Sequence, residues 1–332
     1  MPPEYPADGP VLRVGFVGTG GVATRHATIL AGFPDVLLAA ATDVDPARNA
    51  AFATEFGTEV TDGVADLLAH DLDAVYVCVP PFAHVPAQTS AEAQVAAAGL
   101  PLFVEKPLAP DLSTAEEIAK RLDDAGVVTR VGHHWRCAEP VARARELLAH
   151  RTVRLVSGTW WDKVPPVSWW LHQARSGGPV VEQAIHLLDL ARVLVGEVEV
   201  VQASASGTVP GGDVDAAVVA LLSFVDGAVG TLGTASVLGA KHRAGIEIVA
   251  EGLVVGVGED WLEVYDGVVS SRAEFDRWTA CVAADRAFVD ALAGRPVDPL
   301  HSPPDYEEAL RSHRLATAVA RSAASGAPER LR

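Results

Sequence analysis

A glycine-led segment in the second half of the chain carries side chains suited to proton transfer. Residues 176–189 have the sequence SGGPVVEQAIHLLD, which predicts a glycine turn and then a helix over residues 180–195. Helical spacing places Glu182, His186 and Asp189 on one face. Carboxylates beside an imidazole fix one tautomer and keep its pKa near neutrality, as a general base requires. The alternative is a solvated helix face or a hydrogen-bonded core histidine.

A lysine at the end of a predicted strand is the second candidate for chemistry. The chain has only four lysines, and Lys106 lies in the sequence FVEKP at residues 103–107. Ligands of open α/β sheets bind at the carboxyl ends of the strands, so this position suits a ligand contact. The proline that follows favours extended geometry at Lys106. The alternative is a surface lysine paired with Glu105.

A glycine-rich turn near the N-terminus predicts a dinucleotide site. The segment GTGGVA at residues 18–23 follows an apolar run and begins a predicted helix. In this pattern Gly18 permits the tight turn, Gly20 lets a pyrophosphate approach the backbone, and Ala23 keeps helix and strand close. Asp43, twenty residues after Ala23, would accept hydrogen bonds from both ribose hydroxyls. The residues expected around the pyrophosphate are Gly18, Gly20, Gly21, Val22 and Ala23.

The acidic residue also bears on the choice of cofactor. A carboxylate at Asp43 repels a 2′-phosphate and therefore favours NAD over NADP, whereas Arg48 nearby keeps NADP as an alternative. Asp45 followed by Pro46 is the better helix cap, because proline is favoured at the first helical position. Asp43 is therefore left free to bind the ribose.

Four of the seven tryptophans fall within eleven positions, at residues 160–170. Trp160 and Trp161 lie on a predicted strand, and the other two precede the glycine turn. Flat apolar rings suit the C–H faces of a sugar, although core packing or an oligomer contact is an equal alternative. The substrate-binding residues expected here are Trp161, Trp169, Trp170, His172 and Arg175.

No metal site is expected in this sequence. His133 and His134 are adjacent on a predicted strand and would point to opposite faces, so they do not converge on one ion. The three cysteines are far apart and form no CxxC pattern. This usage fits a reducing compartment and no disulfide framework.

The elements that position these residues change in type along the chain. Nearly continuous apolar runs predict strands buried on both faces of a parallel sheet, with helices between them at residues 84–98 and 112–125. The predicted strands span residues 12–18, 36–42, 74–80, 102–105 and 127–131. This alternation predicts a doubly wound α/β domain over residues 10–131.

The remaining chain, residues 132–332, has the pattern of an α+β domain. Asp226-Gly227, Glu251-Gly252 and Asp266-Gly267 each separate β-like runs and predict hairpins. Helices are expected at residues 276–293 and 306–324. The fold class is therefore α/β, with an N-terminal parallel sheet and a C-terminal domain built on a large, mostly antiparallel open sheet.

Charge and hydropathy exclude several classes of partner. The chain of 332 residues has 26 Lys+Arg against 43 Asp+Glu, a net charge of −17, and has no basic run. Nucleic acid and anionic membrane surfaces are therefore not expected partners. Residues 1–10 lack the apolar core of a signal peptide, and no apolar run reaches the ~18 residues of a membrane span. We expect a soluble protein of the cytoplasm.

Taken in order, the glycine turn at residues 18–23, Asp43, the Pro80-Pro81 pair, the Glu-Lys-Pro triplet at residues 105–107 and the helix with His186 resemble the Gfo/Idh/MocA family. The family is named after glucose-fructose oxidoreductase and inositol dehydrogenase. The resemblance spans nearly the whole chain. It implies an N-terminal Rossmann domain and a C-terminal domain whose open sheet mediates a homodimer or homotetramer. It also implies an NAD(P)-dependent dehydrogenase or reductase acting on a secondary alcohol of a sugar, cyclitol or related polyol.

The resemblance also implies roles for single residues. Lys106 would contact the reacting oxygen and His186 would accept or donate the proton, which predicts that kcat/KM rises with pH through the histidine range. Glu182 stands where the family often has aspartate. The residues expected near the nicotinamide and its ribose are Pro80, Pro81, His84 and Glu105, with His84 expected mainly to pack.

Two other functions remain alternatives at this point. Some members of the family carry out NAD-assisted glycoside hydrolysis or elimination, in which the substrate undergoes no net oxidation. A non-catalytic dinucleotide-binding regulator is the other alternative, and the presence of both Lys106 and His186 argues against it.

Overall fold

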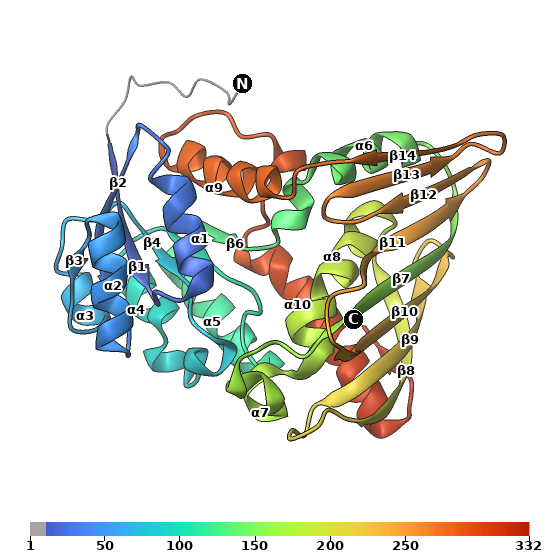
Figure 1. Cartoon of the computed structure of the whole chain (residues 1–332), viewed down its shortest axis with the longest axis horizontal. Helices are drawn as coiled ribbons and strands as arrows, with labels where there is room; N and C mark the ends of the chain where they lie inside the picture. The colour runs from blue at the N-terminus through green and yellow to red at the C-terminus, as the bar shows by residue number, and fades with distance from the viewer. Residues whose placement is uncertain (1–10, 332) are drawn as a thin grey trace.

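A computed structural model of the chain describes residues 11–331 and contains two sheets joined by helices (Figure 1). The first is a six-stranded parallel sheet in the order β3-β2-β1-β4-β5-β6. Its strands are β1 (Leu12–Val17), β2 (Val36–Thr42), β3 (Glu59–Val60), β4 (Ala74–Val77), β5 (Leu102–Val104) and β6 (Thr129–Val131). The predicted doubly wound parallel sheet is confirmed. Residues 1–10, in which the sequence shows no signal-peptide core, lie outside the described residues.

Helices cover both faces of this sheet. They are α1 (Gly21–Leu30), α2 (Pro46–Phe56), α3 (Val64–Leu67), α4 (Ala91–Ala97) and α5 (Leu112–Ala125). Neighbouring residues of β4 enter different cores, since Val75 packs with α4 and α5 while Tyr76 packs with α1. This two-sided burial explains the continuous apolar runs in the sequence.

One predicted helix of the first half is shorter than expected. Instead of a helix over residues 84–98, two short 3-10 turns, η1 (Pro81–His84) and η2 (Ala87–Thr89), precede α4. Pro86 lacks the N–H that an uninterrupted helix would need, so a new helix begins only after Ser90, whose hydroxyl caps it.

The second sheet has nine strands in the order β14-β13-β12-β11-β7-β10-β9-β8-β15 and is mostly antiparallel, as expected. The strands are β7 (Val153–Lys163), β8 (Val198–Thr208), β9 (Asp215–Phe224), β10 (Val229–Leu238), β11 (Arg243–Ala250), β12 (Leu253–Val257), β13 (Trp261–Tyr265), β14 (Ser270–Glu274) and β15 (Glu329–Arg330). The three predicted hairpins join β9 to β10, β11 to β12, and β13 to β14. Each turn places its glycine at positive φ, from +74° to +92°.

The helices of the second half lie on one side of this sheet (Figure 1). They include η3 (His134–Cys137), α6 (Glu139–Leu148), η4 (Ser168–Leu171), α7 (Gln173–Ser176), η5 (Val180–Ala184), α8 (Ile185–Leu194), α9 (Trp278–Leu292), η6 (Pro299–His301) and α10 (Tyr306–Ser325). Helices α8 and α10 lie between the two sheets. No helix within residues 11–331 combines the length and hydropathy needed to span a membrane.

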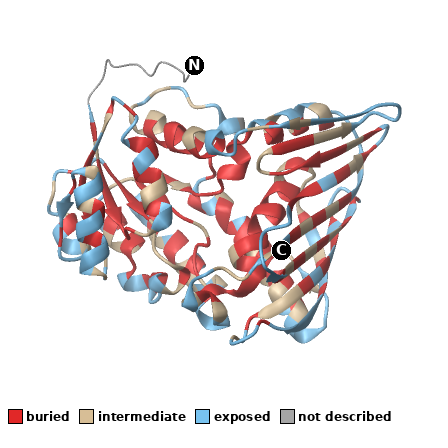
Figure 2. Cartoon of the chain, viewed as in Figure 1, coloured by how far each residue is buried: buried red, intermediate tan, exposed pale blue. Residues whose placement is uncertain are grey.

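The opposite face of the nine-stranded sheet is partly apolar and exposed. Burial alternates along β9, whereas β4 at the centre of the parallel sheet is buried throughout (Figure 2). Trp161, Val219 and Leu221 on the outer face are 39%, 53% and 56% exposed. A single chain therefore leaves a row of large apolar side chains in contact with water.

The last two long helices also contribute to the first core. Phe288 of α9 packs with α1 and β1, and Tyr306 and Leu310 of α10 pack with α4 and α5. The chain thus returns to the parallel sheet after building the second one. The predicted boundary between two domains at residues 131 and 132 stays a prediction.

Candidate active site

The glycine turn leads into a helix whose first N–H groups are free for a ligand. Helix α1 begins after Gly20 with no side-chain cap. Gly18 has φ +86°, and a Cβ there would lie 2.4 Å from the carbonyl oxygen of Cys78, so the fold itself requires glycine. A Cβ at Gly20 would meet no protein atom within 4 Å. The open space at Gly20 and the free helix N-terminus fit a dinucleotide pyrophosphate.

Asp43 lies beside this turn at the end of β2. Its carboxylate accepts hydrogen bonds from the Thr19 N–H at 2.8 Å, the Thr19 hydroxyl at 3.1 Å and the Asp45 N–H at 2.8 Å. A guanidinium nitrogen of Arg48 lies 3.3 Å from Oδ1. Burial opposes ionisation, but these hydrogen bonds and the Arg48 charge lower the pKa of Asp43. Asp45 caps α2 as predicted, so a charged Asp43 is available for the ribose.

Lys106 and Glu182 connect the two halves of the site. Lys106 follows β5, and its Nζ donates to the carbonyl oxygen of Glu182 at 2.8 Å and lies 3.3 Å from Oε1. The other carboxylate oxygen of Glu182 accepts a hydrogen bond from the Trp170 indole N–H at 2.8 Å. The alternative partner, Glu105, accepts only the backbone N–H of Lys106. Both side chains of the pair are 16% exposed, so a substrate can reach them.

The predicted helix around His186 begins with a π-helical turn, η5, before α8. The carboxylate of Glu182 contacts Lys106 and Trp170, and no hydrogen bond joins it to His186 in the part of the chain that the structure describes. The longer side chain of glutamate reaches both partners from this turn. A π-helical turn inside a helix is frequently associated with a functional site.

His186 is buried among aromatic rings. Its imidazole stacks on Trp135, with centroids 5.4 Å apart, and on Trp160 at 6.0 Å. The rings of His134 and His133 meet it edge-on at 5.3 and 5.9 Å. Nδ1 is buried and has no hydrogen-bond partner within residues 11–331.

These surroundings correct the expected pKa of the histidine. Burial lowers the pKa of His186 well below its usual value, and the positive charge of Lys106 acts in the same direction. The prediction of a pKa near neutrality, maintained by flanking carboxylates, is therefore wrong. The imidazole is neutral throughout the physiological pH range, as a proton acceptor must be.

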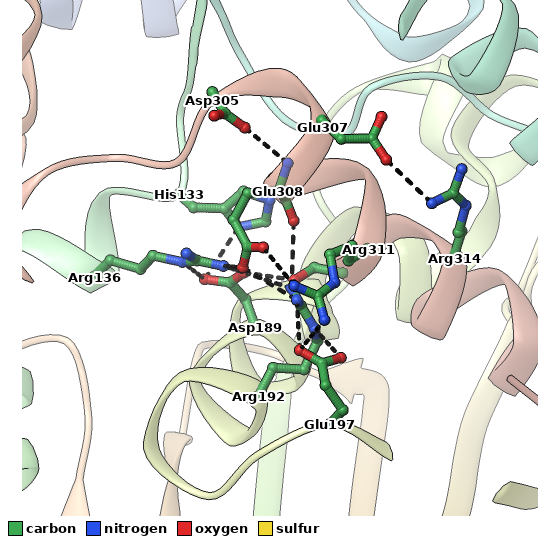
Figure 3. A network of polar contacts seen from close by, with 11 residues as sticks. His133, Arg136, Asp189, Arg192, Glu197, Asp305, Glu307, Glu308, Arg311 and Arg314 are labelled. Atoms are coloured by element: carbon green, nitrogen blue, oxygen red, sulfur yellow. Dashed lines mark hydrogen bonds and ion pairs between the residues drawn. The ribbon is translucent and has the colours of Figure 1, made fainter. Parts of the chain in front are cut away.

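Asp189, the third residue of the predicted polar face, belongs to a structural network (Figure 3). Its carboxylate accepts two hydrogen bonds from Arg136, at 2.6 and 2.7 Å, and one from Ser312 at 2.6 Å. Glu308 of α10 bridges Arg136 and Arg192 at 3.1 Å each. Asp189 therefore anchors α8 to η3 and α10 and does not orient His186 through a hydrogen bond.

The predicted tryptophan contacts divide between the two faces of the sheet. Trp160 and Trp161 are neighbours on β7, so their rings point to opposite sides. Trp160 is the ring that stacks on His186, whereas Trp161 is on the outer face and stacks on His242 at 5.8 Å. This placement corrects the expected substrate contact of Trp161.

The segment before η5 approaches the first half of the chain. The ring of Trp169 lies 6.4 Å from that of Phe82, and the Arg175 guanidinium carbon lies 3.9 Å from the Phe82 ring centroid. Phe82 follows the Pro80-Pro81 pair expected near the nicotinamide ribose. His172 is exposed at the start of α7, where its carbonyl oxygen accepts N–H groups of that helix. Trp169 and Arg175 therefore remain candidates for substrate contact.

Two residues expected near the cofactor have buried side chains. His84 is fully buried and its Nδ1 contacts the carboxylate of Glu92, in agreement with a packing role. The Glu105 carboxylate contacts His26 at 2.9 Å and Arg25 at 3.2 Å. Burial opposes its ionisation, but the hydrogen bond with His26 and the neighbouring cations lower the pKa of Glu105 to about 2.

His133 and His134 do not lie on a strand as predicted, because β6 ends at Val131 and η3 begins at His134. They diverge nevertheless: His133 Nδ1 is 3.7 Å from the Asp189 carboxylate, and His134 Nε2 is 3.2 Å from that of Glu259. The described residues contain no group of three or more candidate metal ligands.

Three residues around His186 and His134 were missed by the sequence analysis. They are Trp135, Lys241 and Glu259, which come from η3 and from connections between strands. Only the scarcity of lysine could have pointed to Lys241, because hairpin connections carry no fixed spacing relative to the histidine helix.

Comparisons with known proteins agree with this geometry. Residues 12–133 match the family model described as "Oxidoreductase family, NAD-binding Rossmann fold", and residues 141–252 match the "GFO/IDH/MocA C-terminal domain". Inositol 2-dehydrogenase of Rhizobium meliloti is 32% identical over 190 residues, which cover 56% of each chain. The aligned part thus spans little more than half of that relative.

Two further proteins are similar over nearly their full length. Myo-inositol dehydrogenase Hyg17 of Streptomyces leeuwenhoekii is 32% identical over 337 residues, covering 95% of this chain and 98% of its own. GenD2 from gentamicin A biosynthesis, solved in complex with NAD, is 29% identical with a TM-score of 0.86, covering 100% of this chain and 99% of its own. The protein therefore belongs to the Gfo/Idh/MocA family of oxidoreductases and has that family's NAD-binding Rossmann domain.

Proposed function

We propose that this protein transfers a hydride between NAD and a secondary alcohol or ketone of a sugar, cyclitol or related polyol. The observation that carries the proposal is the ammonium group of Lys106, held by Glu182 at the end of β5 and close enough to His186 to lower the pKa of its imidazole. Residues 10–131 would bind the cofactor and residues 132–332 the substrate. The inositol dehydrogenases among the relatives support the same substrate class.

Each residue of the site has a distinct part in alcohol oxidation. Bound NAD would supply the hydride acceptor for the carbinol carbon. Lys106 donates a hydrogen bond to the alcohol oxygen and stabilises the negative charge that develops there. Neutral His186 accepts the hydroxyl proton through Nε2, because its Nδ1 is buried. Glu182 and Trp170 hold Lys106 in position.

A substrate panel tests this proposal. The purified protein is mixed with NAD and with myo-inositol, scyllo-inositol, levoglucosan or D-glucose, and absorbance of NADH is followed. We expect NADH to accumulate with at least one alcohol. Product formation without accumulation of NADH would instead support a hydrolase or lyase of the same family.

Cofactor preference is proposed to depend on Asp43. Replacing Asp43 with serine removes the carboxylate that binds the ribose hydroxyls, so Kd for NAD should rise roughly tenfold. It also removes the charge that repels a 2′-phosphate, so the ratio of Kd for NADP to Kd for NAD should fall. Titration of cofactor fluorescence measures both constants. The control is Asp45→Ser, which changes the helix cap and the pair of Asp45 with Arg48 but keeps the Asp43 carboxylate. An unchanged NAD/NADP ratio in Asp43→Ser would show that another residue contacts the ribose.

We further propose a cytoplasmic homodimer or homotetramer that buries the outer face of the nine-stranded sheet. Exposed Trp161, Val219 and Leu221 support this arrangement, because such a row of apolar side chains is stabilised when a second copy covers it. Light scattering should give twice or four times the mass of one chain. A monomer at all working concentrations would contradict the proposal.

A further inference from the structure

A second polar cluster lies beside the aromatic rings that surround His186. Lys241 comes from the connection between β10 and β11, Glu259 from that between β12 and β13, and His134 from η3. His134 Nε2 lies 3.2 Å from one carboxylate oxygen of Glu259, and Lys241 Nζ lies 3.7 Å from the other. Three separate segments thus bring one cation, one carboxylate and one imidazole together.

The cluster contacts the rings that surround His186. The ring of His134 lies 5.3 Å from that of His186, and Lys241 Nζ lies 4.9 Å from the centroid of Trp160. Trp160 in turn stacks on His186. A small ring whose reacting carbon is next to His186 can therefore place its other substituents against this cluster.

The internal contacts of the cluster leave hydrogen-bonding capacity unused. A separation of 3.7 Å between Lys241 and Glu259 is too long for a hydrogen bond, so the ammonium retains donors and the carboxylate retains acceptors. Their side chains are 41% and 17% exposed. Burial opposes ionisation of Glu259, but the His134 hydrogen bond and the Lys241 charge lower its pKa, so it is a carboxylate at neutral pH.

We propose that Lys241 and Glu259 form a distal subsite that binds two hydroxyl groups of the substrate, on carbons other than the reacting one. Lys241 donates to one hydroxyl and Glu259 accepts from the other, which matches a neutral diol. A carboxylate substituent would be repelled by Glu259, and an ammonium substituent by Lys241. The subsite thus deepens the proposed function, on which it rests, by selecting neutral polyhydroxylated rings.

The experiment compares Lys241→Met and Glu259→Met with the unaltered protein, using NAD and myo-inositol. Lys120→Met is the control, because Lys120 pairs with Asp124 on the exposed surface of α5. Loss of a hydrogen bond to a charged group should raise KM for myo-inositol roughly 10- to 100-fold in each variant, with kcat changed little. Unchanged KM in both variants would overturn the proposal.

Deoxy-inositols separate a binding role from a structural one. An analogue that lacks the hydroxyl bound by Lys241 makes no such contact even with the unaltered protein. Lys241→Met and the unaltered protein should therefore have similar kcat/KM on that analogue. Equal losses on myo-inositol and on every mono-deoxy analogue would mean that the substitutions disturb the site as a whole, and would overturn the subsite.

A binding measurement tests the subsite independently of the proposed reaction. Trp135 and Trp160 line the cluster, so myo-inositol should change tryptophan fluorescence even if no hydride is transferred. A response lost in both variants supports the subsite although the proposed reaction fails. A response that both variants retain overturns it. The absence of both turnover and response with myo-inositol, levoglucosan and D-glucose would overturn the assignment to neutral rings.

Discussion

Two buried histidines of this chain have opposite surroundings. His26 on α1 lies between two carboxylates, with Nδ1 2.7 Å from Asp285 and Nε2 2.9 Å from Glu105. His186 on α8 lies among aromatic rings, close to Lys106. Both nitrogens of His26 face carboxylate oxygens, which accept hydrogen bonds. Only an imidazolium has a hydrogen on each ring nitrogen and can donate to both.

The two pKa values differ accordingly. Burial alone would lower the pKa of His26, but the charge of Asp285 and hydrogen bonds to Asp285 and Glu105 raise it to about 9. Burial and neighbouring cations both lower the pKa of His186. Burial is common to the two sites, so the charged neighbours determine which histidine is an ion and which is a base.

Removal of the ionic histidine should have the largest effect. His26→Leu removes the cation paired with the buried Asp285 carboxylate and leaves Glu105 with Arg25, which should reduce the free energy of unfolding by about 3–5 kcal/mol. Urea denaturation followed by circular dichroism measures the change. The control His301→Leu alters an exposed pair with Asp298 and should cost less than about 1 kcal/mol. Equal stability of the two variants would contradict the ionic role of His26.

The pH dependence of unfolding should show the same difference. The folded-state pKa of His26 is about 9 against 6.5 for the unfolded chain, so its stabilisation is complete below pH 6.5 and is lost as pH rises towards 9. The shift corresponds to about 3 kcal/mol. Between pH 6.5 and pH 9 the free energy of unfolding, measured with urea, should fall in the unaltered protein. The fall should exceed that in His26→Leu by roughly this amount. Identical pH dependence would show that His26 is not the titrating group.

Removal of the neutral histidine should affect the reaction more than stability. His186→Asn should reduce kcat/KM for alcohol oxidation by roughly 10²-fold or more, the usual contribution of a positioned base. NAD binding should persist, because the glycine turn and Asp43 belong to the other half of the chain. Steady-state kinetics and NAD titration measure the two effects. Normal turnover by His186→Asn would show that the histidine packs in the core and does not transfer the proton.

A change of charge beside His186 should have the smallest effect. Lys106→Met removes a cation that lowers the pKa of His186, so the acid limb of the residual kcat/KM profile should move upward, by about one pH unit or less. The unaltered protein should show no rise through pH 6.5, contrary to the expectation from sequence. Turnover of Lys106→Met is also expected to fall while NAD binding is retained. An acid limb that stays in place would exclude Lys106 as a determinant of this pKa.

The sequence predicts the cofactor half of the molecule more completely than the substrate half. The glycine turn, Asp43 and Lys106 lie within or directly after parallel strands, so local patterns place them at one edge of the sheet. The length of α5 also follows from local signals, because the helix predicted at residues 112–125 agrees with the structure. Pro86, in contrast, divides a predicted helix.

The environment of His186 depends on contacts that no local pattern encodes. Helical spacing predicts that His186 has carboxylate neighbours. In the structure Glu182 lies on a π-helical turn and contacts Lys106, and Asp189 binds Arg136, so neither carboxylate is hydrogen-bonded to His186 in the described part of the chain. The rings that do surround the histidine come from η3 and β7, far from it in sequence. The identity of the catalytic candidates could thus be predicted, whereas their charge states required the tertiary structure.

The most direct test of the account is the charge of the two histidines themselves. NMR of protein labelled with ¹⁵N-histidine, with resonances assigned from the His26→Leu and His186→Asn variants, reports the protonation of each ring as pH is changed. We predict that His186 remains neutral from pH 6 to pH 8, while His26 remains an imidazolium over this range and loses its proton only near pH 9. Titration of His186 near pH 6.5 or above would contradict the account.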